Sequence, residues 1–223
     1  MYENKTIIQI GSHVGNTIND PIFNQVDKTT TLILIEPVPY LFEQLKENYK
    51  NKNIDELHFI NKAVSSYVGN IELTIPSQNN DFSKFPFYAS QLSSVNETHA
   101  VKHFPNLITK KITVPTTTLD EIVKDYNIKE IEVLYSDTEG HDYDIIMNYS
   151  FTVKPFKILF EHKHMDGIEL NGNKDPKGER YNALVDKLNS LGYKLKFRDS
   201  EDTLVQLSSP IDIIKNNRLS KDM

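Results

Sequence analysis

Apolar residues in this chain fall into short runs that stop abruptly at a glycine, an acid or a proline. Residues 6–10 form the first run and end at Gly11, and residues 32–35 form the second and end at Glu36. Similar runs lie at 57–64, 131–136 and 157–161. Short apolar runs rich in β-branched residues are typical of strands buried on both faces.

Between these runs, apolar residues recur at the spacing of amphipathic helices. One such helix follows Pro39, and a capping box of Thr118 and Glu121 begins another. Further helices are predicted over about residues 142–149 and 181–191. Strands that alternate with helices favour parallel strands joined by right-handed crossovers, so the pattern predicts an α/β fold.

Other segments depart from this alternation. Apolar residues alternate with polar ones over residues 71–75, which predicts a half-exposed strand, and residues 112–115 are interpreted as a short strand. Residues 193–197 and 203–207 alternate on either side of a polar turn and predict a β-hairpin. The polar stretch 16–25 is interpreted as a short helix or helical turn.

Residues 77–110 lose all periodicity and gather Ser, Asn, Phe, Tyr and Pro. A long irregular insert in a compact domain is usually a lid or a binding loop. The polar residues 210–223 predict a loose tail. Because no internal repeat or linker interrupts the chain, we interpret residues 1–223 as a single domain.

Composition narrows the classes of function. The 223 residues are 38% hydrophobic and 25% charged, and the formal net charge of -6 argues against long stretches of nucleic acid as a partner. The chain has no cysteine, which excludes disulfides, thiolate metal sites and a cysteine nucleophile. We see no signal-peptide pattern and no apolar run long enough to span a bilayer, so we expect a cytoplasmic protein without a membrane partner.

Gly11 and Gly15 follow the first strand, and Glu36 closes the second, 25 residues after Gly11. Glycines let backbone approach a bound nucleoside, and an acid roughly 20 residues further on can accept hydrogen bonds from its ribose hydroxyls. The spacing Gly-x-x-x-Gly lacks the first pair of the dinucleotide fingerprint. It therefore favours S-adenosylmethionine, which has a ribose and no phosphate, over NAD or FAD. The alternative is that the glycines only form a turn.

Chemically rich segments follow each predicted core strand. In an open parallel sheet, ligands bind outside the carboxyl ends of the strands. We therefore expect five segments to converge at one edge of the sheet: residues 11–15, 36, 61–63, 137–139 and 161–164.

Five motifs in chain order resemble the signature of FkbM-type methyltransferases: QIGSHVG (9–15), EP (36–37), NKAVS (61–65), TTLD (117–120) and DTEG (137–140). The resemblance runs from about residue 6 to 162. It implies an S-adenosylmethionine-dependent O-methyltransferase with a single Rossmann-like domain. It also implies a mostly parallel seven-stranded sheet that ends in an antiparallel hairpin, with helices on both faces. The chain departs from the family at Ser12-His13, where Ala-Asn is frequent, and at Thr138, where Val is common.

The resemblance assigns residues 11–15 to the methionine part of the cofactor, Glu36 to its ribose and residues 61–63 to the adenine neighbourhood. It also places a serine pair at Ser93 and Ser94 over the cofactor, with a flexible polar loop as the equal alternative. The residues expected to contact S-adenosylmethionine are Gly11, Ser12, His13, Gly15, Asn16, Glu36, Pro37, Asn61, Ala63, Ser94 and Asp137.

Transfer to a hydroxyl needs an aligned acceptor and a group that removes its proton. Asp137 and Glu139 share a face if the strand stays extended, and we place Asp137 nearest the acceptor. The alternative is that both acids cap the next helix. His162 and His164 also have same-face spacing and are candidate bases. A divalent ion held by these four residues is the less favoured alternative to ordinary loop histidines, so we predict no metal ligand.

The sequence thus predicts an S-adenosylmethionine-dependent methyltransferase that acts on a hydroxyl of a small molecule or sugar. Two alternatives stay open. One is an inactive module that binds the cofactor without transfer, and the other is a dinucleotide-dependent oxidoreductase. The insert carries no recognisable acceptor motif, and neither the general base nor the oligomeric state is legible from the residues.

Overall fold

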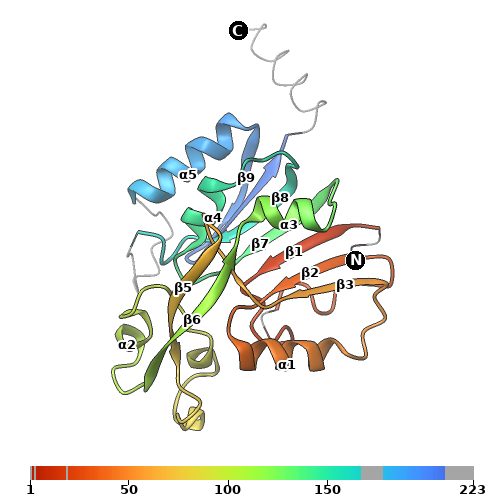
Figure 1. The fold of residues 1–223 in the computed structure, drawn as a ribbon. Coiled ribbons are helices and arrows are strands. Elements are labelled where there is room, and N and C mark those ends of the chain that lie inside the picture. Colours follow the sequence, from red (N-terminus) through yellow and green to blue (C-terminus); the bar gives the residue numbers. More distant parts are fainter. Residues whose placement is uncertain (1, 3, 19, 167–177, 209–223) are drawn as a thin grey trace, which may run out of the picture.

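A seven-stranded sheet forms the centre of the protein (Figure 1). The computed structural model describes residues 2, 4–18, 20–166 and 178–208. The strand order is β3-β2-β1-β7-β8-β10-β9. Pairing is parallel from β3 to β8 and antiparallel at β10 and β9, which confirms the predicted α/β fold with its final hairpin. The strands are β1 (Thr6–Ile10), β2 (Thr31–Ile35), β3 (Glu56–Ile60), β7 (Ile131–Ser136), β8 (Pro155–Glu161), β9 (Tyr193–Arg198) and β10 (Asp202–Leu207).

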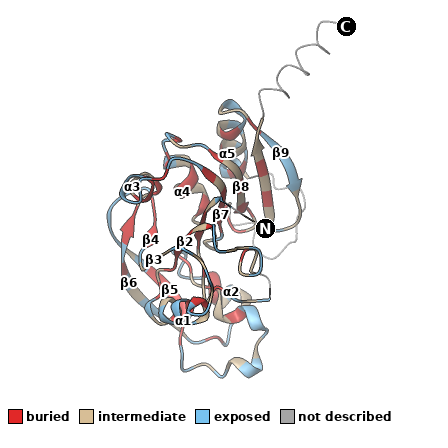
Figure 2. Cartoon of the chain, turned by 90° about the vertical axis from the view of Figure 1, so that its right-hand side faces the viewer, coloured by how far each residue is buried: buried red, intermediate tan, exposed pale blue. Residues whose placement is uncertain are grey.

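Helices cover both faces of this sheet because successive strand residues point in opposite directions. Ile8 of β1 belongs to the apolar core that includes α3 (Leu119–Asp125), α4 (Asp142–Asn148) and α5 (Glu179–Ser190). The adjacent Ile7 belongs to a separate core, which includes residues of α1 (Pro39–Tyr49). Figure 2 shows buried residues along the strands and on the inner sides of the helices.

A second sheet of three strands was not predicted. It has the order β4-β6-β5 and consists of β4 (Ala63–Val64), β5 (Gly69–Pro76) and β6 (Thr109–Thr117). The single strand expected over residues 57–64 is therefore two strands in different sheets, and the strand expected over 112–115 is much longer. Eight antiparallel pairs between β5 and β6 explain that length.

The insert has short helices and its own apolar cluster. Its helices are η1 (Phe82–Lys84), η2 (Phe87–Ser90) and α2 (His99–His103). The side chains that hold it together are Leu92, Ala100 and Leu107, with Phe82, Phe85 and Phe104 packed against them. The insert is thus a folded unit beside the sheet rather than an extended loop.

Two further expectations concern residues 16–25 and the tail over residues 210–223. Of the short helix or helical turn expected over residues 16–25, the described part forms only turns, and the Val26 amide donates to the Ile22 carbonyl oxygen as in a single helical turn. Asp20 closes one of them by accepting hydrogen bonds from the amides of Ile22 and Phe23, and Pro21 fits a turn better than a helix interior. The tail predicted over 210–223 lies outside the described residues. No helix in the described ranges has the length and apolar character needed to cross a membrane.

Candidate functional site

A cavity of about 640 Å³ opens at the carboxyl ends of β1, β2, β7 and β8. Its volume lies within the range of small-molecule sites. The insert also contributes to its wall, through residues such as Ser93 and Ser94. All five segments expected to converge therefore contribute residues to the lining of one cavity.

The loop after β1 depends on two glycines with left-handed backbone. Gly11 has a φ of +78°, and a Cβ there would lie 1.9 Å from the carbonyl oxygen of Asp137. Gly15 has a φ of +71°, and a Cβ there would lie 2.3 Å from Leu45 on α1. Both glycines therefore permit close approach to the protein itself. Gly11 lines the cavity, whereas Gly15 and Asn16 do not.

Glu36 lies at the centre of the first half of the site. Its side chain is buried, and its two oxygens each accept a 2.8 Å hydrogen bond, one from the His13 amide and one from the Val38 amide. Burial raises the pKa of Glu36 to about 7. The hydrogen bonds from the two amides lower this pKa, but their effect is smaller than that of burial. Each oxygen keeps a further lone pair, so the carboxylate can also accept hydrogen bonds from a ligand.

The neighbours of Glu36 hold it in place. Asn61 donates its side-chain amide to the carbonyl oxygens of Glu36, at 2.8 Å, and Pro37, at 3.2 Å. Asn61 therefore positions the end of β2 and does not line the cavity, whereas Ala63 does. Burial lowers the pKa of His13 to about 4, so this ring is neutral at pH 7.

Several carboxyl groups lie close together in the other half of the site, and of these Asp142 and Glu161 are buried. Burial, followed by the charge of Glu139, raises the pKa of Asp137 well above its ordinary value. Burial, followed by the charge of Glu139, also raises the pKa of Glu161 well above its ordinary value. Asp142 accepts a hydrogen bond of 2.8 Å from the Thr138 hydroxyl and fixes the turn after β7. Among the described residues, no hydrogen bond links Asp137 or Glu139 to the first turn of α4, so helix capping does not explain either acid.

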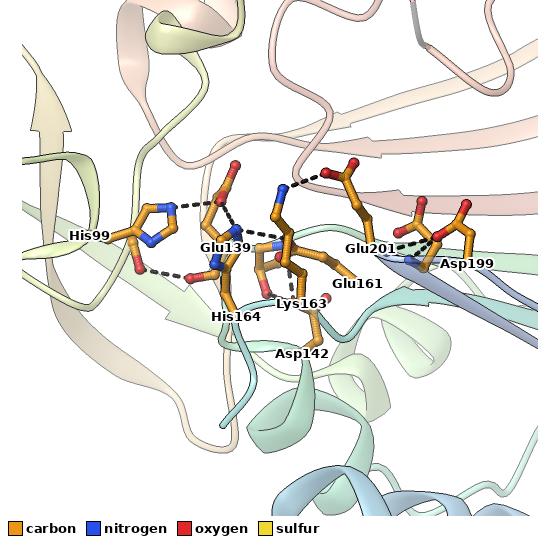
Figure 3. Close-up of polar contacts among 11 residues, drawn as sticks. His99, Glu139, Asp142, Glu161, Lys163, His164, Asp199 and Glu201 are labelled. Carbon is orange, nitrogen blue, oxygen red and sulfur yellow. Dashed lines mark hydrogen bonds and ion pairs between the residues drawn. The ribbon is translucent and has the colours of Figure 1, made fainter. Parts of the chain in front are cut away.

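Two histidines meet the carboxylates here (Figure 3). Glu139 Oε2 lies 2.7 Å from Nε2 of His99 and 3.5 Å from Nε2 of His164, and the latter atom lies 3.2 Å from Glu161 Oε1. We call His99, Glu139, Glu161 and His164 the histidine–carboxylate cluster. Burial lowers the pKa of His164 to about 3, so this ring is neutral at pH 7.

Glu139 is held in an unusual backbone conformation. Its φ is +53°, so the strand does not stay extended and the shared face expected for Asp137 and Glu139 does not form. Ser94 of the insert donates its hydroxyl to the Glu139 carbonyl oxygen at 2.8 Å. The insert thereby fixes the acidic turn as well as covering it.

His162 is not brought to this cavity. The strand ends at Glu161, and the amides of His162 and Lys163 both donate to the Glu201 carbonyl oxygen, so the chain turns and the alternation expected for His162 and His164 is lost. His162 Nδ1 instead lies 2.9 Å from the Thr203 hydroxyl. It is a buried structural residue in this position.

The predicted site residues therefore divide into two groups. Those that line the cavity are Gly11, Ser12, His13, Glu36, Pro37, Ala63, Ser94, Asp137, Glu139 and His164. Those that do not are Gly15, Asn16, Asn61 and His162.

Sequence reasoning missed His99 and His103, which the insert brings beside His164. Their i, i+4 spacing on one helix face is the one signal that could have drawn attention to them. The arrangement as a whole suits a ligand with hydroxyl groups at Glu36 and positive charge near Asp137 and Glu139.

Comparison with known proteins gives a family and a fold. A family model described as methyltransferase FkbM domain matches residues 9–195, and no curated protein matches the chain. The structure resembles methyltransferase FkbM from Methylobacillus flagellatus, with 13% identity and a TM-score of 0.51 over 92% of this chain. The match spans only 44% of that protein's length.

Two other solved structures share less. An O-methyltransferase from Bacillus cereus in complex with SAH has 10% identity and a TM-score of 0.48, over 92% of this chain and 74% of that one. Aeropyrum pernix fibrillarin, with natively bound S-adenosyl-L-methionine, has 12% identity and a TM-score of 0.46, over 91% and 66%. At such identities the likenesses concern the fold alone.

Proposed function

This chain belongs to the methyltransferase FkbM domain family, and from that membership we propose that it transfers the methyl group of S-adenosylmethionine to a hydroxyl of a small molecule or sugar. The observation that carries the proposal is the meeting of three features on one cavity. These are the loop at Gly11, the buried acceptor Glu36 and the acids Asp137 and Glu139. The cavity has room for both a nucleoside-bearing donor and part of an acceptor.

The residues present fit the cofactor. Glu36 lines the cavity, and each of its oxygens keeps a lone pair to which a ribose hydroxyl can donate a hydrogen bond. The neutral ring of His13 adds no positive charge beside a cationic donor. The acids Asp137 and Glu139 favour positive charge at their end of the cavity. When bound, S-adenosylmethionine supplies a methyl carbon on a positively charged sulfur, which leaves as a neutral thioether.

The protein's own task is to align the acceptor and take its proton. Asp137 is suited to that task because it lines the cavity, and no described residue donates a hydrogen bond to its carboxylate. In the proposed step, Asp137 receives the proton of the acceptor hydroxyl as the oxygen bonds to the methyl carbon. The insert closes this half of the cavity and limits the access of water.

A binding titration of S-adenosylhomocysteine against wild type and Glu36→Gln, at pH 8, tests the proposal. We expect at least about tenfold weaker binding by the variant, because a hydrogen bond to a charged acceptor is worth about 1.5–3 kcal/mol. Glu43→Gln is the matched control, since Glu43 is exposed on α1, pairs with Lys46 and does not line the cavity. Equal affinity for all three proteins would mean that the ribose does not bind at Glu36.

A turnover assay separates transfer from binding alone. Wild type is incubated with S-adenosylmethionine and a panel of sugars and small alcohols, and the release of S-adenosylhomocysteine is measured. Release that depends on an acceptor supports the transferase and removes the inactive binding module as an alternative.

A further inference from the structure

The histidine–carboxylate cluster joins three parts of the chain that are distant in sequence. Glu139 follows β7, Glu161 ends β8 and His164 lies in the turn after β8, while His99 comes from α2 of the insert (Figure 3). Ligand atoms of Glu139, Glu161 and His164 all lie within 4.8 Å of one another. From this geometry we propose that Glu139, Glu161 and His164 bind one divalent first-row transition-metal ion.

The distances in the cluster are those of ligands around one ion. Two ligand atoms that each lie about 2.1 Å from a metal are about 3.0 Å apart at a right angle and about 3.4 Å apart at the tetrahedral angle. Nε2 of His164 lies 3.2 Å from Glu161 Oε1 and 3.5 Å from Glu139 Oε2. The three groups therefore need little movement to share an ion.

An unsatisfied atom supplies independent support for a ligand. The Glu161 residue is only 7% exposed, and its Oε2 has no hydrogen-bond partner among the described residues. Leaving a buried carboxylate oxygen unpaired is costly, and metal coordination is one of the few ways to satisfy it. The nearby ammonium group of Lys163 is already paired with Glu201 (Figure 3).

The surroundings of the cluster resemble the outer shell of a metal site. Metal-bound carboxylates are usually held by further hydrogen bonds. His99 Nε2 lies 2.7 Å from Glu139 Oε2, and Ser94 holds the backbone of the same residue. Both contacts fix the orientation of Glu139 toward Glu161 and His164.

The donor atoms indicate the class of metal. Imidazole suits Zn²⁺ and Fe²⁺, and a set of two carboxylates with one imidazole also accepts Mn²⁺, whereas Mg²⁺ prefers oxygen ligands and retains its water. This assignment replaces the expectation of no metal ligand. That expectation weighed Asp137 and His162 together with Glu139 and His164, and it did not include Glu161 or the contact with His99.

Binding of the ion is independent of the proposed methyl transfer. A possible role does rest on it: an ion at this place can coordinate the acceptor hydroxyl and lower its pKa, which eases loss of the proton to Asp137. The test therefore measures metal binding alone and follows cofactor binding separately.

The experiment uses the untagged 223-residue chain, stripped with EDTA and titrated with MnCl₂, ZnCl₂ and MgCl₂ by calorimetry, with the EPR signal of Mn²⁺ as a second readout. We expect one Mn²⁺ or Zn²⁺ per wild-type chain and much weaker binding of Mg²⁺. Glu161→Gln and His164→Gln should each weaken binding at least tenfold. His58→Gln should leave it unchanged, because this histidine packs against the Tyr126 ring and does not line the cavity.

Each contrary outcome has a defined meaning. The absence of stoichiometric binding, or equal binding by the variants, overturns the site, and Mg²⁺ binding as tight as that of Mn²⁺ overturns the class of metal. Normal binding by Glu161→Gln with loss in His164→Gln overturns the named ligands, since His99, His103 and His164 form a second group within reach of an ion. If Glu161→Gln does not fold, as judged by near-UV circular dichroism, Glu139→Gln provides the same readout.

A parallel titration with S-adenosylhomocysteine separates the two proposals. Cofactor binding without metal binding removes only the metal site. Metal binding without cofactor binding removes only the proposed methyl transfer.

Discussion

The carboxyl groups in two regions of the cavity, at Glu36 and in the histidine–carboxylate cluster, differ in their hydrogen-bond partners. Both oxygens of Glu36 accept hydrogen bonds from backbone amides, and the residues that provide them lie within the first 38 positions of the chain. In the histidine–carboxylate cluster, the carboxyl groups face histidines and one another, and Glu161 retains an unpaired oxygen. The difference teaches that the hydrogen bonds of Glu36 are supplied by its own neighbourhood, whereas the cluster leaves a buried carboxyl oxygen without a partner among the described residues.

The largest expected effect on stability is at Gly11, where the loop after β1 contacts the backbone of Asp137. In Gly11→Ala, the new Cβ would meet the Asp137 carbonyl oxygen and the residue would keep a left-handed φ. Left-handed backbone alone costs about 1–2 kcal/mol, and the clash adds to it, so the free energy of unfolding should fall by more than about 3 kcal/mol. Urea denaturation measures the change.

Gly69→Ala is the matched control for that substitution. A Cβ there would meet nothing closer than the Tyr67 ring, at 3.5 Å. We expect the control to change the free energy of unfolding by less than about 1 kcal/mol. Similar losses in both variants would show that the close contact between Gly11 and Asp137 is not what makes Gly11→Ala destabilising.

The pH dependence of cofactor binding sharpens the comparison at Glu36. The pKa of about 7 lies above the ordinary value of 4.5, so the carboxylate loses its charge as the pH falls through 7. Affinity for S-adenosylhomocysteine should therefore rise about tenfold between pH 6 and pH 8, in proportion to the ionised fraction. Titrations of Glu36→Gln across the same range should be nearly flat, and a parallel rise in this variant would assign the dependence to another group.

The same raised pKa acts on stability with the opposite sign. Without ligand, the contribution of Glu36 to the free energy of unfolding is complete below pH 4.5. It is lost as the pH rises through about 7, because the folded state holds the proton more tightly than the unfolded state.

The smallest expected effect is at Asn61. Asn61→Ala removes the side-chain donor to the carbonyl oxygens of Glu36 and Pro37 and should lower the free energy of unfolding by about 1 kcal/mol. Affinity for S-adenosylhomocysteine should fall less than tenfold, and affinity for Mn²⁺ should not change. In the control Asn148→Ala, the lost donor is on an exposed turn of α4, and neither affinity should change. A loss of Mn²⁺ affinity in Asn61→Ala would show that the two regions are coupled.

The main sheet was predictable because its information is local. A buried run that stops at Gly11 or Glu36 identifies a strand and its end from neighbouring residues alone. The small sheet was not predictable in this way. A turn was expected where residues 57–64 end the third strand, but neighbouring residues alone do not show that Ala63 begins another strand, in a different sheet.

The candidate site divides along the same line. Glu36 could be chosen because Gly11 and Glu36 each follow the end of one of two consecutive strands, β1 and β2, which are legible from neighbouring residues. The contact of His99 with Glu139 could not, because it spans 40 residues and depends on how the insert folds over the sheet. His162 was predicted at the site because we assumed that side chains keep alternating beyond the end of β8. The hydrogen bonds to Glu201 that turn the chain there join distant parts of the sequence, so neighbouring residues do not reveal them.

The ladder between β5 and β6 has a consequence for how this protein can diversify. Pro76, at the end of β5, pairs with Thr109, at the start of β6, so everything between them leaves and returns at the same rung. A segment anchored in this manner can be lengthened, shortened or exchanged at little more than the entropy of closing a loop. Grafting a different insert can thus vary one wall of the cavity, provided that Ser94 and His99, which hold Glu139, are retained.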